Sequence, residues 1–260
     1  MNHRFKHAFS LVELSIVLVI LGLLAGGILS GQSLIRAAQT RSISTDLARF
    51  QTAMFSFRDK YSAIPGDMTN ATAFWSAADT DAATCKTTAS TGKATCNGNG
   101  DGWICSSDGG CGSHRNGDWY ERYRTWQHLA NAGLIEGSYS GVDGGNNAWH
   151  HVAGKNSPAS KITGATYALF GTKTITNIST LWDGDYGNVI EFRNNDATNW
   201  VTLLPEEMWN IDTKLDDGRP GSGSVVSYKP AHQANCATDA TSYKLLHTSA
   251  ACSIIFKLGI

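Results

Sequence analysis

The hydrophobic pattern divides the chain into an apolar N-terminal segment and a longer mixed part. Residues 9–29, FSLVELSIVLVILGLLAGGIL, are almost all apolar and include one charged residue, Glu13. As a helix rising about 1.5 Å per residue, this segment would cover roughly 30 Å, the thickness of a bilayer core. Arg4 and Lys6 precede it without any acid. The positive-inside rule therefore predicts a cytoplasmic N-terminus and a C-terminal part across the membrane.

The pattern becomes amphipathic between residues 31 and 63. Apolar residues recur there at alternating steps of four and three: Ile43, Leu47, Phe50, Met54, Phe57 and Tyr61. This spacing forms one stripe of an α-helix, so we expect the apolar helix to continue outward. The stripe should pack on the globular domain or on neighbouring helices. Ile64-Pro65-Gly66 should end the helix, because residues before proline avoid the α region.

The remainder predicts an α+β domain. A helix is expected from Asp118, with Trp119, Tyr123 and Trp126 on its core side, and a short one from Pro205. Short runs of β-branched and aromatic residues predict strands at 165–170, 187–193, 224–228, 243–246 and 252–258. The adjacent His150 and His151 are interpreted as surface residues. The expected fold is a long N-terminal helix packed by its outer half on an antiparallel sheet.

The N-terminus carries a recognisable motif. A short basic leader ends in the small residue Ala8, the aromatic Phe9 follows, and Glu13 lies four residues further on. This string resembles the class III signal of type IV prepilins and type II secretion pseudopilins. The resemblance implies a pilin-like fold, cleavage by prepilin peptidase between Ala8 and Phe9, and N-methylation of Phe9. Most members carry glycine where this chain has Ala8.

The resemblance also implies an organisation, a location and partners. Residues 1–8 would be the leader, 9–30 the transmembrane and filament-core helix, 31–63 its amphipathic continuation, and 64–260 the globular domain. The protein would cross the bacterial inner membrane once, with its C-terminal domain in the periplasm, or at the cell surface once assembled into a pilus. Its partners would be prepilin peptidase, other pilin or pseudopilin subunits, the inner-membrane assembly platform and membrane lipid.

Glu13 has two interpretations. An ionised carboxylate in a lipid-compatible segment is costly and usually has a partner. In a bundle of parallel helices, Glu13 could meet the free amine of Phe9 on the neighbouring subunit, which would remove two unpaired-charge penalties. Alternatively, Glu13 lies in the headgroup zone and is tolerated through snorkelling or protonation. The adjoining leader motif favours the assembly role.

Composition and charge narrow the range of functions that this chain could have. The 260 residues carry a formal net charge of −1, which gives no sign of nucleic-acid binding. No nucleophile-elbow, paired-histidine metal or phosphate-loop motif is present, so an enzyme is not expected. The globular part, about 200 residues, is larger than in abundant major subunits, which favours a minor structural subunit. The alternative is a membrane-anchored binding or adhesion module, suggested by eight tryptophans and the long loops between 69 and 160.

An even cysteine count in an oxidising compartment favours disulfides. The six cysteines are Cys85, Cys96, Cys105, Cys111, Cys236 and Cys252. Among the first four, proximity favours pairing in chain order, although three connectivities are open. A zinc site is the rival, but its usual short paired gaps are absent. The pair Cys236 and Cys252 resembles the C-terminal disulfide loop of many type IV pilins.

One loop partly matches a calcium-binding scheme. Asn97, Asn99 and Asp101 stand at the first, third and fifth positions, with glycine at the sixth and Asp108 at the twelfth. The alternative is a glycine-asparagine turn held by nearby disulfides, which we favour. The acidic turn from Asp212 to Asp217 is a second possible calcium cluster, although solvated turn residues are the simpler interpretation. No other cofactor is expected.

Overall fold

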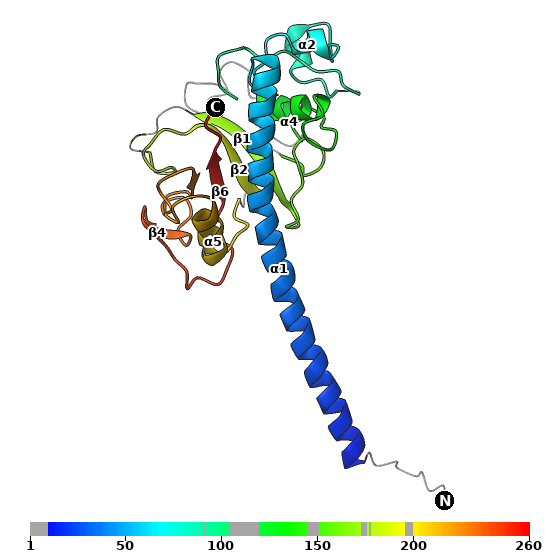
Figure 1. Cartoon of the computed structure of the whole chain (residues 1–260), viewed down its shortest axis with the longest axis vertical. Coiled ribbons are helices and arrows are strands. Elements are labelled where there is room, and N and C mark those ends of the chain that lie inside the picture. The colour runs from blue at the N-terminus through cyan, green and yellow to red at the C-terminus, as the bar shows by residue number, and fades with distance from the viewer. Residues whose placement is uncertain are drawn as a thin grey trace, which may run out of the picture. The chain divides into compact units, whose positions relative to one another are not determined.

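The structure is a computed structural model that describes residues 10–90, 92–104, 120–144, 151–172, 176, 178–195 and 200–260. It contains two compact units, Met1–Arg41 and Ser42–Ile260, and one helix contributes to both (Figure 1). The helices are α1 (Leu11–Tyr61), α2 (Ala71–Phe74), α3 (Ala82–Cys85), α4 (Glu121–Asn131) and α5 (Pro205–Leu215). The strands are β1 (Ala165–Thr172), β2 (Gly187–Asn194), β3 (Val225–Val226), β4 (Ala237–Asp239), β5 (Ser242–Tyr243) and β6 (Ile254–Lys257).

Helix α1 is 51 residues long and joins the apolar and amphipathic segments without a break. Its most apolar 18-residue window has a mean hydropathy of 2.5, and none of that window is buried. By length and composition, α1 could cross a membrane. The prediction of one long N-terminal helix is confirmed.

The stripe of α1 forms the centre of the main core. Its fully buried members are Ile43, Leu47, Phe50, Met54 and Phe57. The ring centroid of Phe50 lies 4.9 Å from that of Trp126 on α4 and 4.9 Å from that of Tyr167 on β1, both in edge-on geometry. This arrangement is favourable for aromatic pairs beyond the area that they bury. The amphipathic stripe therefore packs within its own domain, as predicted.

The main sheet is antiparallel, with strand order β1-β2-β6-β3. Figure 1 shows β1, β2 and β6 side by side. Strands β1 and β2 pair along their whole length, from Ala165 opposite Asn194 to Thr172 opposite Gly187. Because successive side chains in a strand point to opposite faces, Ile190 belongs to the main core while Val189 belongs to a second apolar cluster. Both faces of the sheet are thus covered, and the α+β class consistent with a pilin-like fold is confirmed.

Three predicted strands are shorter than expected, and the 252–258 run forms a strand only over Ile254–Lys257. The 224–228 run forms only the two-residue strand β3. The prediction of a strand over 243–246 is wrong beyond Tyr243, because the chain turns there: the backbone N–H of His247 donates to the carbonyl of Lys244 at 2.9 Å. Leu246 is consequently 97 % exposed.

Helix α4 is enclosed on all sides, since every residue from Glu121 to Leu129 is buried. Asp118 and Trp119, from which a helix was expected to start, lie outside the described residues, as does His150. The surface interpretation of His151 is wrong. It is 1 % exposed, and its ring centroid lies 4.8 Å from that of Tyr123, because the segment after residue 150 packs on α4.

Two disulfides are present among the described residues. Cys85 is bonded to Cys96 and Cys236 to Cys252, the same pairs that the sequence favours. Cys105 and Cys111 lie outside the described residues.

Candidate functional site

The first turn of α1 places Glu13 at the helix N-terminus. The backbone N–H of Ser10 donates to Glu13 Oε2 at 2.9 Å, and the backbone N–H of Val12 donates to Ser10 Oγ at 3.3 Å. The two bonds cap the helix start as a variant of the capping box, in which the serine oxygen accepts the N–H of the second helical residue and the glutamate accepts that of the serine. The negative charge also lies at the favourable end of the helix dipole.

This role was missed by the sequence interpretation, although Ser10-Leu-Val-Glu13 has the spacing of a capping box. Among the described residues, Glu13 has no other hydrogen bond, and it is exposed. One carboxylate oxygen of Glu13 is therefore held by the helix itself. Ala8 and Phe9, the predicted processing residues, lie outside the described residues.

Comparison with protein families identifies the segment that contains this turn. Residues 3–29 match the model of the prokaryotic N-terminal methylation motif. This is the prepilin-type motif of type IV pilins and pseudopilins. The match includes Ala8, Phe9 and Glu13 and ends within α1, so the domain from Ser42 onward lies outside it. No curated protein and no solved structure matches the chain significantly.

The predicted calcium loop is organised around a residue that the sequence scheme does not include. Asp67 Oδ1 accepts the backbone N–H groups of Gly100 and Asp101 at 2.6 and 3.1 Å, and its Oδ2 accepts that of Gly102 at 2.9 Å. Successive backbone N–H groups of this kind form an anion-binding nest. Here the anion is the chain's own carboxylate.

Each described loop residue proposed as a ligand has one side-chain oxygen that accepts a backbone N–H. Asn97 Oδ1 accepts the N–H of Thr72, and Asn99 Oδ1 accepts the N–H of Asp101, each at 2.9 Å. Asp101 Oδ1 accepts the N–H of Trp103, also at 2.9 Å. The bonds from Asn99 and Asp101, each to the residue two positions on, are typical of Asx turns. Asp108, the predicted final ligand, lies outside the described residues.

Three carboxylates nevertheless gather beside this loop. Asp67, Asp101 and Glu121 each offer an oxygen within 4.8 Å of the others, and Glu121 Oε1 accepts the N–H of Asn99 at 2.9 Å. Burial raises the pKa of Asp67, while the N–H bonds from Gly102 and Gly100 oppose that shift. The sequence signal for Asp67 was its place at the end of the Ile-Pro-Gly-Asp turn. Its contact with residues 100–102 could not be predicted from the neighbouring sequence.

The second acidic cluster also differs from its sequence interpretation. Asp212, Asp216 and Asp217 lie within 4.8 Å of one another by one oxygen each, but Asp212 is buried. The hydroxyl of Tyr243 donates to Asp212 Oδ2 at 2.6 Å, and burial raises the pKa of Asp212 to about 7. The interpretation of Asp212 as a solvated turn residue is therefore wrong, because its carboxylate joins α5 to β5 through the hydrogen bond from Tyr243.

Proposed function

We propose that this chain is a minor structural subunit of a type IV pilus or of a type II secretion pseudopilus. The observation that carries the proposal is the methylation motif at residues 3–29, on a helix whose apolar side chains are uncovered. Proteins with this motif are structural subunits rather than enzymes. A domain of about 200 residues supports the minor role by its size alone.

The exposed helix requires a partner for its surface. From Leu11 to Ile35, every large hydrophobic side chain is at least 50 % exposed. Full burial of such a side chain is worth about 1.5–3 kcal/mol relative to exposure in water. Lipid would supply that burial before assembly, and parallel helices of neighbouring subunits would supply it in a filament.

Glu13 would select the register of assembly. Cleavage after Ala8 gives Phe9 a free amine, and an axial offset between neighbouring helices brings that amine to the carboxylate of another subunit. In a core of low dielectric constant, two opposite charges that pair are far less costly than two that remain unpaired. The C-terminal domain would face the periplasm, as the basic leader favours.

The N-terminal mass of the native protein tests this proposal. In cells with active prepilin peptidase, the chain should begin at an N-methylated Phe9, and in cells without the peptidase it should begin at Met1. Ala8→Gly should be processed like the wild type, and Ala8→Glu should block cleavage, since the site requires a small residue. An unprocessed chain in peptidase-positive cells would refute the proposal.

A further inference from the structure

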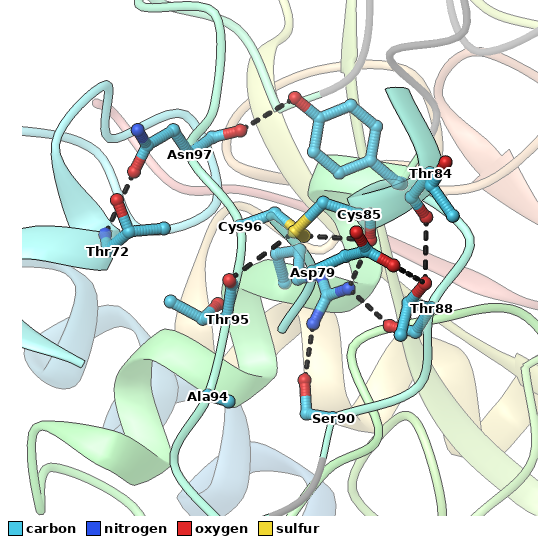
Figure 2. Close-up of a disulfide and its surroundings, with 12 residues drawn as sticks. Thr72, Asp79, Thr84, Cys85, Thr88, Ser90, Ala94, Thr95, Cys96 and Asn97 are labelled. Atoms are coloured by element: carbon cyan, nitrogen blue, oxygen red, sulfur yellow. Dashed lines mark hydrogen bonds between the residues drawn. A yellow bond between two sulfur atoms is a disulfide. The ribbon is translucent and has the colours of Figure 1, made fainter. Parts of the chain in front are cut away.

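The two described disulfides have different surroundings. Cys85 and Cys96 line a pocket of about 330 Å³, together with Lys86, Asn97 and Tyr120. Figure 2 shows their S–S bond between the strand-like segment at Thr95 and the turn that leads to Thr88. Cys85 and Cys96 are 4 % and 2 % exposed, whereas Cys236 and Cys252 are both 0 % exposed and belong to the main hydrophobic core.

Two side chains of opposite charge, Lys86 and Asp79, line the pocket beside the disulfide. Tyr120 packs with Cys85 and Cys96 in a small apolar cluster separate from the main core. The ammonium of Lys86 lies 5.1 Å from the centroid of the Tyr120 ring, and Lys86 lines the same pocket. A neighbouring cation stabilises a thiolate relative to its thiol, whether the thiolate attacks or leaves.

The loop between the two cysteines has other attachments to the domain. Arg124 Nη2 on α4 donates to the carbonyl oxygens of Cys85 at 2.9 Å and Thr88 at 2.8 Å. Gln127 Nε2, one turn along α4, donates to the carbonyl of Ala94 at 2.8 Å. The loop is thus held near both ends by bonds that do not involve sulfur, and we expect it to keep its place when the disulfide opens.

We propose that Cys85–Cys96 is a thiol-exchange site, reached through this pocket by a small anionic thiol, and that Lys86 accelerates the exchange. The incoming thiolate forms a bond to one cysteine sulfur, and the S–S electron pair leaves on the other cysteine as a thiolate. A second thiolate then attacks the reagent sulfur of the mixed disulfide, which releases the oxidised disulfide of the reagent and the second cysteine thiolate. The two reagent molecules supply the two electrons, and the protons that they lost on ionising convert the two cysteine thiolates to thiols. This inference does not depend on filament assembly.

The experiment uses the full chain in detergent micelles and reduced glutathione, a small thiol with a net negative charge. Samples are quenched with N-ethylmaleimide at intervals, and each cysteine is quantified by peptide mass spectrometry. Cys85 and Cys96 should become labelled at least about tenfold faster than Cys236 and Cys252, because only the first pair borders the pocket. Far-UV circular dichroism should stay unchanged while the first pair opens.

Lys86→Gln isolates the role of the charge. This variant should slow the reduction of Cys85–Cys96 by glutathione about threefold or more, because the thiolates lose their neighbouring cation. Lys93→Gln is the matched control, since Lys93 is exposed on the same disulfide-closed loop and does not line the pocket. It should react at the wild-type rate, and thermal melts should verify that both variants are folded.

Three results would overturn the inference. The two disulfides could open at the same rate, the Cys85–Cys96 bond could open only in denaturant that unfolds the domain, or Lys86→Gln could react as fast as Lys93→Gln. The first two would show that the pocket gives no access to sulfur. The third would show that the charge of Lys86 does not accelerate the exchange.

Discussion

Glu13 accepts a hydrogen bond from the backbone N–H of Ser10, at 2.9 Å, in the first turn of α1. The residue proposed to bind the next subunit therefore also completes its own helix. The two roles need different properties of the side chain. Capping requires an acceptor oxygen, whereas pairing with a neighbouring amine requires a negative charge.

Substitutions at Glu13 separate these roles. Glu13→Gln keeps an acceptor oxygen without the charge, and Glu13→Ala removes both. If charge pairing drives assembly, both variants should remain in the membrane but enter filaments at a small fraction of the wild-type level. Ser10→Ala is the control, because it removes the serine half of the cap and keeps the charge, and should assemble. The measurement is the amount of subunit in sheared or purified filaments relative to the membrane fraction.

Normal assembly of Glu13→Gln would contradict the pairing argument and leave only the helix cap as the role of Glu13. Failure of Ser10→Ala together with Glu13→Ala would also point to the cap. The pairing argument thus predicts one pattern across three variants: glutamine and alanine at residue 13 fail, and alanine at residue 10 succeeds.

The packing of Phe50 gives a second prediction. Its ring is 1 % exposed and contacts Trp126 and Tyr167, so Phe50→Ala should destabilise the domain by about 3–5 kcal/mol. Phe55→Ala is the matched control on the same helix, because Phe55 lies off the buried stripe and is only half-buried. It should cost about 1 kcal/mol. Urea unfolding of the full chain, followed by tryptophan fluorescence, measures both.

Equal losses for Phe50→Ala and Phe55→Ala would show that the buried stripe does not carry the stability of this helix. The comparison is informative because the two substitutions remove the same atoms from the same element. The two rings differ in burial and in the aromatic contacts that only Phe50 makes with Trp126 and Tyr167.

The stripe could be predicted because a helix repeats its buried face every three or four residues. The spacing of the apolar residues from Ile43 to Phe57 was therefore enough to predict that they are buried. The positions of β1 and β2 could be predicted similarly, from two runs with strand composition, but their pairing with each other could not. Leu246 could not be placed, because a short apolar run looks the same inside a strand and after one. Whether the strand continues is decided by the turn at Lys244.

In the candidate site too, features set by neighbouring residues could be predicted, and features set by contacts between distant segments could not. The capping box of Ser10 and Glu13 is local, and its signal was present in the sequence. Asp67, however, contacts residues 100–102 across more than thirty positions, and only the folded domain brings them together. His151 is buried for the same kind of reason, because its partner Tyr123 comes from a different segment.

The loop around Asp67 allows a test of the calcium prediction. The oxygens of Asn97, Asn99 and Asp101 already accept backbone N–H groups, so we expect no shift of the melting temperature on addition of a chelator. Asp67→Asn should instead destabilise the loop by about 1–3 kcal/mol, because an amide nitrogen is a donor and cannot accept the N–H of Gly102.

Asp101→Asn is the control for that experiment, since Asp101 is exposed and its carboxamide could still accept the N–H of Trp103. It should change the stability by less than about 1 kcal/mol. A fall of several degrees with chelator, reversed by calcium, would establish an ion in this loop and contradict the expectation. Thermal melts monitored by circular dichroism provide the measurement.

His128 gives a prediction about pH. Its Nδ1 accepts the N–H of Gly66 at 2.9 Å, so Nδ1 carries no proton, and Nε2 is then the donor to Thr95 Oγ1, also at 2.9 Å. Burial, reinforced by the charge of Arg124, lowers the pKa of His128 to about 3. Protonation would place a hydrogen on Nδ1 against the N–H of Gly66 and leave a charge in the core.

Since the pKa of an unfolded histidine is about 6.5, the unfolded chain binds an extra proton between pH 6.5 and 3. The stability from neutral His128 is therefore complete above pH 6.5 and falls as the pH decreases, by up to about 1.4 kcal/mol per pH unit. His128→Asn keeps an acceptor for Gly66 and cannot be protonated in this range. It should be less stable than the wild type at pH 7 and lose stability less steeply between pH 6.5 and 4.

Urea unfolding at several pH values measures both slopes, and the difference between them isolates His128 from the carboxylates that titrate in the same range. His247→Asn is the control for the loss of an imidazole, because His247 follows β5 outside the main core. Parallel profiles for wild type and His128→Asn would mean that the unfolded chain gains no extra proton at this position. His128 would then not be the neutral, buried acceptor that its bond to Gly66 requires.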